Sequence, residues 1–209
     1  MNKETYLADP CGASALPFRK TEEIRIPAGM SVVREDQFDA ARCTGTDEPY
    51  FKLIHPLKEI RQAELPPAFR PVPCSTAEFA RHIGECYTDE GVTAEELEQY
   101  RQRPVYDPEL WIAVGDAEGR IAASGIAELD TRIGEGSLEW IQVSPEYRRK
   151  GLGRYIVCEL LRRLKGKADF VTVSGRVNNE ENPMALYLAC GFRHPVIWHV
   201  IRDGEGQHE

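Results

Sequence analysis

Residues 138–165 constrain the fold more than any other part of the chain, because their hydrophobic period changes partway along. Residues 138–143 are mostly apolar and β-prone, which predicts a buried strand. Ser144 and Pro145 end this strand, since proline cannot donate to a strand ladder and fits a turn. Apolar residues then recur every three or four positions, which predicts a helix over residues 152–165. The chain therefore passes from a buried strand through one short loop into a helix.

The loop between this strand and this helix combines glycines with concentrated positive charge. In a chain of formal net charge −8, four basic residues lie close together: Arg148, Arg149, Lys150 and Arg154. Gly151 and Gly153 have no Cβ, so a phosphate can approach the backbone there. The first N–H groups of a helix have no intrahelical acceptor, and the helix dipole favours an anion beside them. We therefore predict an anion site over residues 148–154; the alternative is a solvated basic turn that caps the helix.

The spacing within the loop separates several classes of phosphate site. A Rossmann loop needs a third glycine where this chain has Ile156. A P-loop needs Gly-Lys-Ser/Thr, whereas here Lys150 precedes Gly151 and a leucine follows. From Arg148 to Gly153 the loop has the spacing R/Q-x-x-G-x-G/A, and it resembles the acyl-CoA pyrophosphate loop of the GNAT N-acetyltransferase superfamily.

A second segment supports the same resemblance. Residues 182–192 read Asn-Pro-Met-Ala-Leu-Tyr-Leu-Ala-Cys-Gly-Phe, which is similar to the GNAT motif N-x-x-A-x-x-x-Y followed by Gly-Phe. Tyr187 lies earlier in the segment than the tyrosine of that motif, in a Leu-Tyr form that is also common in the family. Asn182 and Pro183 also fit the N-cap and first position of a helix, so capping and a place near the cofactor both stay open for Asn182. With two motifs in the right order, the chain is identified as a member of the GNAT superfamily.

The predicted order of elements agrees with this resemblance over residues 66–201. From Phe69 onward the patterns predict a strand, two helices, three antiparallel strands, a helix, a strand, a helix and a strand. The two consecutive helices begin with capping-box signals: Ser75 with Glu78, and Thr93 with Glu96. The expected fold is α/β, with a mixed sheet covered by helices on both faces, as in GNAT acyltransferases.

The residues before this region are predicted to be an addition to it. The segment Leu65-Pro66-Pro67 is typical of a linker, so we expect an N-terminal extension of unknown role over residues 1–65 and a GNAT domain over residues 66–209. Residues 1–20 show no clear period and are expected to be partly disordered. The extension contains two predicted strands, at residues 30–34 and 50–56.

Composition limits the class of protein further. With 209 residues, of which 42% are hydrophobic and 29% charged, the chain suits a soluble globular protein. It has no secretory h-region and no apolar stretch of membrane-spanning length, so we expect a cytoplasmic protein without membrane attachment. The net charge of −8 argues against nucleic-acid binding, which needs a basic face. Six scattered cysteines show no metal-binding spacing, so no metal is expected, and they suit a reducing compartment.

The resemblance implies an enzyme that transfers an acetyl group from acetyl-CoA to a primary amine, which attacks the thioester directly. The pyrophosphate is implied to bind the loop, at Arg148, Arg149, Lys150, Gly151, Leu152, Gly153 and Arg154. The pantetheine arm is implied to pair, like a guest strand, with the backbone of Ile141, Gln142 and Val143. Space for the arm is expected where strands 138–143 and 170–174 separate, and Asn182 is implied to lie near the cofactor.

Two residues are assigned catalytic roles. The resemblance implies that Tyr187 protonates the leaving CoA thiolate as a positioned weak acid; the alternative is a packing tyrosine with its hydroxyl at the surface. A backbone N–H near Val143 is a candidate donor to the oxyanion. Glu139 is the candidate general base, because a two-residue period places it on the strand face of Ile141 and Val143. Glu128 on the neighbouring strand is the other candidate, and a solvated carboxylate is the alternative for both.

The sequence says less about the acceptor amine than about the acyl donor. Between Arg81 and Arg101, in the region of the two helices after the first strand of the predicted domain, the chain has no Lys or Arg and six acidic residues: Glu85, Asp89, Glu90, Glu95, Glu96 and Glu98. This pattern favours a cationic small-molecule or peptide amine; the alternative is a solvated helical face. Three alternatives also stay open. The chain could be a non-catalytic acetyl-CoA-binding sensor or interaction module, it could transfer a longer acyl chain, and it could form a homodimer.

Overall fold

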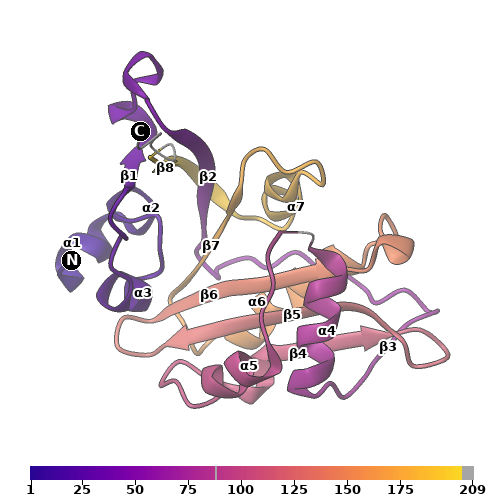
Figure 1. Ribbon diagram of the computed structural model, residues 1–209. Coiled ribbons are helices and arrows are strands. Elements are labelled where there is room, and N and C mark those ends of the chain that lie inside the picture. Colours follow the sequence, from indigo (N-terminus) through magenta and orange to yellow (C-terminus); the bar gives the residue numbers. More distant parts are fainter. Residues whose placement is uncertain (88, 204–209) are drawn as a thin grey trace.

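The computed structural model describes residues 1–87 and 89–203, in which the chain forms one eight-stranded sheet (Figure 1). The strands are β1 (Met30–Arg34), β2 (Thr46–His55), β3 (Arg70–Pro71), β4 (Trp111–Gly115), β5 (Ile121–Asp130), β6 (Glu135–Val143), β7 (Phe170–Arg176) and β8 (Arg193–Arg202). The α-helices are α1 (Lys3–Ala8), α2 (Pro10–Ala13), α3 (Phe18–Glu23), α4 (Thr76–Cys86), α5 (Ala94–Tyr100), α6 (Leu152–Leu164) and α7 (Pro183–Ala189).

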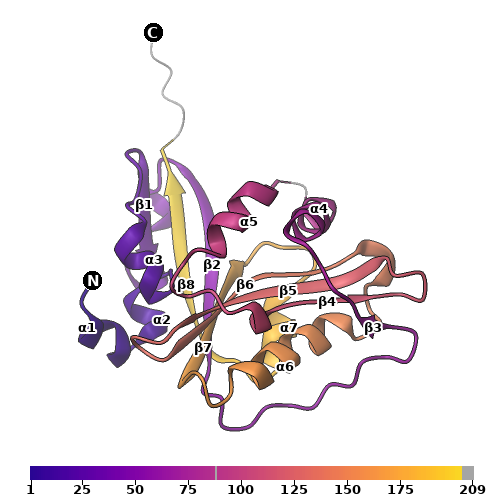
Figure 2. The same cartoon turned by 90° about the horizontal axis from the view of Figure 1, so that it is seen from below.

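The sheet is mixed and is covered on both faces. The strand order across it is β1-β8-β2-β7-β6-β5-β4-β3. In the described ranges, β6 and β7 pair in parallel, and the other neighbouring strands pair antiparallel. Helices α4 and α5 lie on one face of the sheet, and α6 and α7 lie on the other (Figure 2). The expected α/β fold, a mixed sheet between two layers of helices, is therefore confirmed.

Helix α6 forms the core on its face of the sheet. Its apolar stripe has the spacing that the sequence predicts and is buried, as at Leu152, Ile156, Leu160 and Leu164. Two glycines of the sheet let the helix approach closely. A Cβ on Gly125 would lie 2.5 Å from the Ile156 side chain, and one on Gly136 would lie 2.8 Å from the Leu164 side chain. This close packing fixes the first turn of α6, and with it the basic loop, against the sheet.

The predicted starts of the two consecutive helices are also present. Both capping boxes form, with Ser75 and Glu78 at the start of α4 and Thr93 and Glu96 at the start of α5. These signals are local, so they could be recognised without knowledge of the tertiary structure. None of the helices in the described part of the chain has the length and apolar character that a bilayer crossing requires.

The chain begins with three short helices, so the expectation of partial disorder over residues 1–20 is wrong. Helices α1, α2 and α3 contain four to six residues each, too few to show a hydrophobic period. Their order comes from tertiary contacts. Tyr6 is fully buried and Phe18 is nearly so, and the two rings pack with their centroids 5.3 Å apart.

The first 65 residues also supply strands to the sheet. The two strands predicted there are present as β1 and β2, and β2 lies between β7 and β8. Leu53 of β2 pairs with Val173 of β7. The sheet therefore crosses the predicted division at Leu65-Pro66-Pro67, because a proline-rich segment marks a loop but does not determine how the flanking strands pair. Residues 204–209, which were assigned to the second part, lie outside the described ranges.

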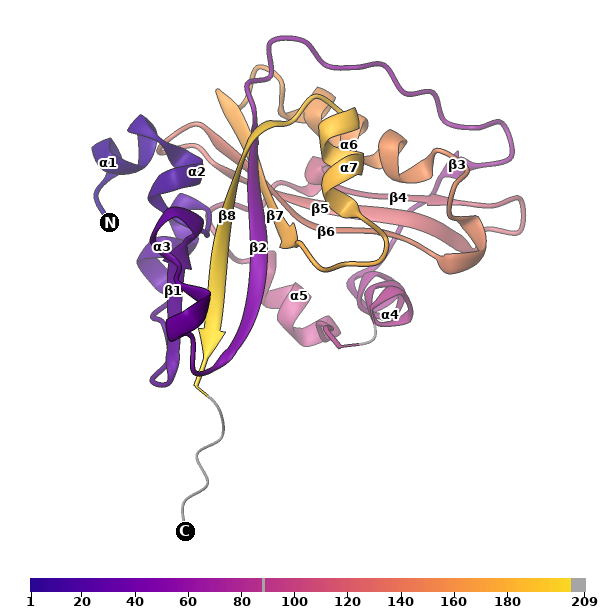
Figure 3. The ribbon, with the colours of Figure 1, turned by 90° about the horizontal axis from the view of Figure 1, so that it is seen from above.

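The connection from β2 to β3, which contains the proline pair, runs along the side of the sheet that carries α6 and α7 (Figure 3). Two hydrogen bonds fasten it there. Arg61 Nη1 donates to the Ala189 carbonyl at 2.7 Å, and Arg154 Nη2 donates to the Gln62 carbonyl at 3.2 Å. The segment that was expected to be a linker thus packs beside the start of α6 and the end of α7, the two helices that carry the sequence motifs.

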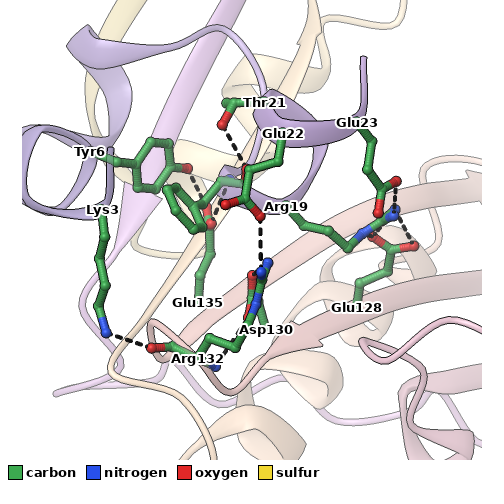
Figure 4. A network of polar contacts seen from close by, with 11 residues as sticks. Lys3, Tyr6, Arg19, Thr21, Glu22, Glu23, Glu128, Asp130, Arg132 and Glu135 are labelled. Atoms are coloured by element: carbon green, nitrogen blue, oxygen red, sulfur yellow. Dashed lines mark hydrogen bonds and ion pairs between the residues drawn. The ribbon is translucent and has the colours of Figure 1, made fainter. Parts of the chain in front are cut away.

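A buried polar cluster joins the N-terminal helices to the sheet (Figure 4). Glu135 of β6 accepts from the Tyr6 and Thr172 hydroxyls, both at 2.6 Å, and from the Phe18 N–H at 2.9 Å. Lys52 of β2 is 1% exposed. Its Nζ donates to the Tyr6 hydroxyl at 2.9 Å and to three backbone carbonyls between α2 and α3 or within α2. Burial lowers the pKa of Lys52 to about 8 and raises the pKa of Glu135.

We expect Lys52→Met to lower the free energy of unfolding by about 3 kcal/mol, because it leaves the Glu135 carboxylate buried without a nearby cation. Lys58→Met changes an exposed lysine three residues beyond β2 and serves as the matched control, with an expected change within about 0.5 kcal/mol. Urea unfolding followed by circular dichroism measures both. Equal stability of the two variants would contradict the role given to the buried cluster.

Candidate active site

Strands β6 and β7 separate after a short parallel stretch. They pair over residues 135–138 of β6, after which β7 continues along β2 while β6 continues along β5. The separation begins at a β-bulge. The register with β5 shifts between Leu138 and Trp140, so Glu139 has no pairing partner on β5. A gap in the sheet therefore opens where the resemblance predicts it.

Beyond the bulge, the edge of β6 on the β7 side pairs with no strand of the described ranges. The Ser144 N–H donates across to β5 at 3.0 Å, so by alternation the peptide groups of Ile141 and Val143 point into the gap. Side chains satisfy their carbonyls. The Tyr87 hydroxyl donates to the Ile141 carbonyl at 3.0 Å, and Arg148 Nε donates to the Val143 carbonyl at 3.3 Å. An extended ligand with amide groups has the donors and acceptors needed to pair along this edge.

Gln142 lies between these two residues but faces the other way. Its peptide groups alternate toward β5, where it pairs with Ser124. Its buried side chain contacts the same residue, with Nε2 against the Ser124 hydroxyl, and its Oε1 has no hydrogen-bond partner in the described residues. Of the three residues predicted to pair with a pantetheine arm, Ile141 and Val143 present backbone groups to the gap and Gln142 does not.

The basic loop leaves the first turn of α6 free of side-chain caps. Gly151 is the N-cap in the left-handed conformation, with φ of 86°, and no side chain accepts from the helix N–H groups. A Cβ on Gly151 would meet no atom within 4 Å, so the space beside the loop is open. A Cβ on Gly153 would lie 3.3 Å from Leu186 and 3.5 Å from Val143, so this glycine lets α6 pack closely against α7 and β6. The amides of Leu152, Gly153 and Arg154 are therefore positioned to receive an anion.

The four cations of the loop differ in their partners, and Arg154 donates to the Gln62 carbonyl as described above. Arg148 Nη1 lies 2.7 Å from Glu181 Oε1, which joins the loop to the start of α7. Lys150 Nζ lies 5.1 Å from the centroid of the Tyr147 ring. Arg149 and Lys150 are both exposed, and Arg149 has a positive φ of 63°. The loop thus combines a fixed arginine with two exposed cations beside the free amides.

Asn182 and Tyr187 lie on α7, on the same side of the sheet as α6. The Asn182 side chain accepts from the Ala185 N–H at 3.3 Å, with Pro183 at the first helical position, so the capping prediction is confirmed. Tyr187 is 6% exposed, and its ring packs against Phe192 with centroids 5.6 Å apart. Asn182 itself is exposed at the helix start.

The Tyr187 hydroxyl is suited to give a proton rather than to take one. Burial, together with the nearby Tyr87 and Cys190, raises the pKa of Tyr187 well above its ordinary value. Tyr87, one of the groups that contribute to this shift, donates its own hydroxyl to the Ile141 carbonyl at the gap. In the described residues, the Tyr187 hydroxyl makes no hydrogen bond, so it is available to a ligand.

Glu139 does not share a strand face with Ile141 and Val143, so that prediction is wrong. The Ile141 and Val143 side chains pack with the core under α6. Glu139 instead accepts from the Ser137 hydroxyl at 2.5 Å, and the next residue, Trp140, packs with the core under α4. The extra residue of the bulge breaks the two-residue period, and it turns Glu139 toward the α4 and α5 face.

Helix α3 pairs with both candidate base carboxylates. Lys20 forms an ion pair with Glu139. Arg19 Nη2 lies 3.0 Å from Glu128 Oε2, and Arg103 Nη1 lies 3.1 Å from Glu128 Oε1 (Figure 4 shows the Arg19 contact). Burial and the charge of Glu139 raise the pKa of Glu128. Neither carboxylate is solvated, since the Glu128 and Glu139 side chains are only 7% and 10% exposed.

Several acidic residues of the α4–α5 region have cationic partners. Arg176 of β7 pairs with Asp89, and its Nη2 lies 2.5 Å from Glu90 Oε1. Glu98 Oε2 lies 3.1 Å from Arg101 Nη1. These pairs neutralise part of the negative surface from which a cationic acceptor was predicted.

Three residues near the gap were not found from the sequence: Lys20, His82 and Tyr87. Lys20 precedes Glu139 by 119 residues, and nothing local to either position indicates their contact. His82 of α4 is buried, with Nδ1 2.8 Å from Ser124 Oγ and Nε2 2.9 Å from Ser144 Oγ. Tyr87 could have been recognised from the sequence, because a tyrosine on an apolar helix face needs a partner for its hydroxyl.

The gap therefore offers an anion site at the start of α6, a strand edge for amide groups, and a protonated phenol nearby. These groups fit a ligand with a diphosphate at one end and an amide-containing arm, which is the chemistry of coenzyme A. In residues 1–87 and 89–203, no group of three or more His, Cys, Asp or Glu side chains is arranged to hold a metal ion.

Comparison with known proteins agrees with this geometry. Residues 107–194 match the family model of the acetyltransferase (GNAT) domain. No match was found among curated proteins. Among solved structures, a GCN5-related N-acetyltransferase from Sphaerobacter thermophilus is similar, with a TM-score of 0.66 and 19% identity; the match covers 86% of this chain and 62% of that one.

Two further structures have the same arrangement. An acetyltransferase from the GNAT family from Colwellia psychrerythraea has a TM-score of 0.57 and 13% identity, with coverage of 83% of this chain and 65% of that one. A tandem GNAT protein from the clavulanic acid biosynthesis pathway has a TM-score of 0.54 and 16% identity, with coverage of 85% and 65%. The present chain thus spans less than two thirds of the length of these three proteins, and at these identities the likeness concerns the fold.

Burial of His82 beside the site predicts a pH-dependent stability. Burial lowers its pKa from 6.5 to about 4, so below pH 6.5 the unfolded chain binds a proton that the folded chain does not. Stability therefore falls as the pH decreases through this range. We expect His82→Gln to remove about 2 kcal/mol of the loss measured between pH 7 and pH 5.

Urea unfolding at the two pH values tests this prediction. His194→Asn is the control, because His194 is exposed, and it should leave the pH dependence of the intact chain unchanged. The same pH dependence in His82→Gln and in the intact chain would show that His82 is not buried in its neutral form.

Proposed function

Because residues 107–194 match the family model of the acetyltransferase (GNAT) domain, we propose that the protein transfers an acetyl group from acetyl-CoA to a primary amine. One observation carries the proposal: the uncapped amides of α6 lie beside the unpaired edge of β6. The amides suit a diphosphate, and the strand edge suits the amide groups of a pantetheine arm. A thioester at the end of that arm would lie beside the bulge, where β6 and β7 separate.

The donor is held by groups from three elements. The diphosphate accepts hydrogen bonds from the amides of residues 151–154 and pairs with the charges of Arg149 and Lys150. The arm pairs with the backbone of Ile141 and Val143, where it replaces the contacts from Tyr87 and Arg148 to their carbonyls. Arg148 is then free to add its charge to the diphosphate site. Asn182 serves this site by capping α7, the helix that carries the proposed acid.

Tyr187 is the proposed acid of the reaction. When the amine attacks the thioester carbonyl, the carbon–sulfur bond breaks and the sulfur leaves as a thiolate. A raised phenol pKa keeps Tyr187 protonated, so its hydroxyl has a proton to give. A backbone N–H at the β6 edge, near Val143, supplies the hydrogen bond to the carbonyl oxygen as it gains charge.

Glu139 is the proposed base. The bulge turns its carboxylate to the α4 and α5 face, whereas the amides of α6 are on the opposite side of the sheet. Acetyl-CoA and the acceptor amine can therefore approach the break in the sheet from opposite faces. An amine arrives as an ammonium ion and must lose a proton before it attacks, and a carboxylate next to the thioester can accept that proton.

The acceptor is a small-molecule or protein amine. Its ammonium group is complementary to the carboxylates of Glu139 and Glu128, where it would take the place of Lys20 and Arg19. The negative charge of α4 and α5 adds less than the sequence suggests, because Arg176 and Arg101 pair with part of it.

One observation favours a second candidate, an acetyl-CoA-binding module without transferase activity. Both candidate base carboxylates are already paired with α3, through Lys20 and Arg19. If these pairs persist, acetyl-CoA binds but no added amine reaches the base. Thiol release from acetyl-CoA over a panel of amines distinguishes the two functions, since the module binds acetyl-CoA without releasing thiol.

We expect Arg149→Ala to weaken acetyl-CoA binding about tenfold at low ionic strength, because it removes an exposed cation beside the diphosphate site. Lys165→Ala is the matched control, since it removes an exposed cation at the opposite end of α6. Isothermal titration calorimetry measures both. Equal affinities in the two variants would place the diphosphate elsewhere.

We expect Tyr187→Phe to lower the rate of thiol release with an acceptor amine about 100-fold, while the acetyl-CoA dissociation constant stays within about twofold. The control is Tyr155→Phe, on the same side of the sheet in α6. Stopped-flow measurement of thiol release gives the rate, and calorimetry gives the affinity. An unchanged rate in Tyr187→Phe would reject the acid role.

A further inference from the structure

Lys20 brings a primary amine of the chain itself to the proposed base. Helix α3 is held in place by its own first two residues. The Phe18 N–H donates to Glu135 at 2.9 Å, and Arg19 pairs with Glu128 at 3.0 Å. These contacts leave Lys20 directed at Glu139, with which it forms an ion pair. The Lys20 side chain is 21% exposed, so it lies at the edge of the pair rather than sealed in the core.

The position of Glu139 places the Lys20 amine beside the free edge of β6. Glu139 is the bulge residue, and the free edge of β6 begins just after it, at Ile141. The face that carries Lys20 is opposite the face that carries α6. A thioester held on the β6 edge, with its diphosphate at α6, would therefore present its carbonyl to an amine that arrives from the side of Lys20.

Lys20 is also in the charge state that a substrate amine has on arrival. Burial lowers its pKa, but the charge of Glu139, the hydrogen bond to Glu139 and the charge of Glu128 outweigh that effect and raise the pKa overall. Lys20 is thus an ammonium ion in contact with a carboxylate that can take its proton. Lys52, another lysine held by the N-terminal helices, donates instead to the Tyr6 hydroxyl and to three backbone carbonyls, and none of its hydrogen bonds within the described residues goes to a carboxylate.

We propose that Lys20 is a self-acetylation site, at which the chain transfers an acetyl group from its own bound acetyl-CoA to the Lys20 Nζ. The inference rests on the proposed function. It adds an acceptor, a lysine side chain, that the position of α3 supplies within the molecule.

The step balances in atoms and charge. Lys20 gives one proton to Glu139, and its neutral Nζ forms a bond to the thioester carbonyl carbon. The carbon–sulfur bond breaks, and its electron pair stays on sulfur, which takes a proton from Tyr187. The second proton lost by the nitrogen restores the Tyr187 hydroxyl. The products are acetyl-lysine, the free thiol of CoA and one proton, which Glu139 passes to solvent.

The test is mass spectrometry of the purified full chain after incubation with acetyl-CoA, followed by mapping of the acetylated peptide. We expect Lys20 to gain an acetyl group at least tenfold faster than exposed Lys58, which reports chemical acetylation, and faster than buried Lys52. The rate should not depend on protein concentration, because the acceptor is in the same molecule as the donor.

Two variants sharpen the test. Lys20→Arg keeps a cation for Glu139 but removes the nucleophile, so the acetyl group at this peptide should disappear while acetyl-CoA binding is retained. Glu139→Gln should slow acetylation of Lys20 at least tenfold with acetyl-CoA binding retained. Acetylation of Lys20 at the same rate in Glu139→Gln, or in the urea-unfolded chain, would overturn the proposal.

Calorimetry and thiol release separate failure of this inference from failure of the proposed function. If the chain binds acetyl-CoA and releases thiol with added amines while Lys20 stays unmodified, self-acetylation is excluded and the transferase stands. If the chain neither binds acetyl-CoA nor releases thiol, both proposals are rejected.

Discussion

The break between β6 and β7 is the constraint on which the rest of the site depends. Paired strands satisfy each other's backbone groups, so a sheet that opens in its centre exposes donors and acceptors that need other partners. Here Tyr87 and Arg148 supply two of them, at the Ile141 and Val143 carbonyls. These partners are side chains and not a neighbouring strand, so a ligand with amide groups can take their place without breaking a strand pair. The bulge at Glu139 produces this edge and also turns a carboxylate to the other face.

The N-terminal residues complete the sheet and cover the same break. Strand β2 lies between β7 and β8, so these residues are part of the structure that holds the site open. The buried contacts of Glu135 with Tyr6 and Phe18 place α3 over β5 and β6. From there Arg19 pairs with Glu128, and Lys20 pairs with Glu139. The segment therefore affects both the stability of the sheet and the access of an amine to the site.

Features governed by neighbouring residues could be predicted from the sequence. The change of period at residues 144–152 identified a strand, a loop and a helix, because side-chain burial follows the period of each element. The two capping boxes and the Asn182 cap were predictable for the same reason, since each involves groups within one turn of helix. The GNAT resemblance of the basic loop and of the segment around Tyr187 added the expected cofactor.

The tertiary structure decided what depends on contacts between distant residues. An inserted residue at Glu139 reversed the face predicted from a two-residue period, and the sequence does not mark a bulge whose cause is pairing with another strand. The short helices α1 to α3 have no period of their own, so only their burial on the sheet fixes them. The sequence by itself determined the local elements and the anion loop. The fold determined that Lys20, 119 residues away, meets Glu139, because a contact across the chain is set by packing and not by local pattern.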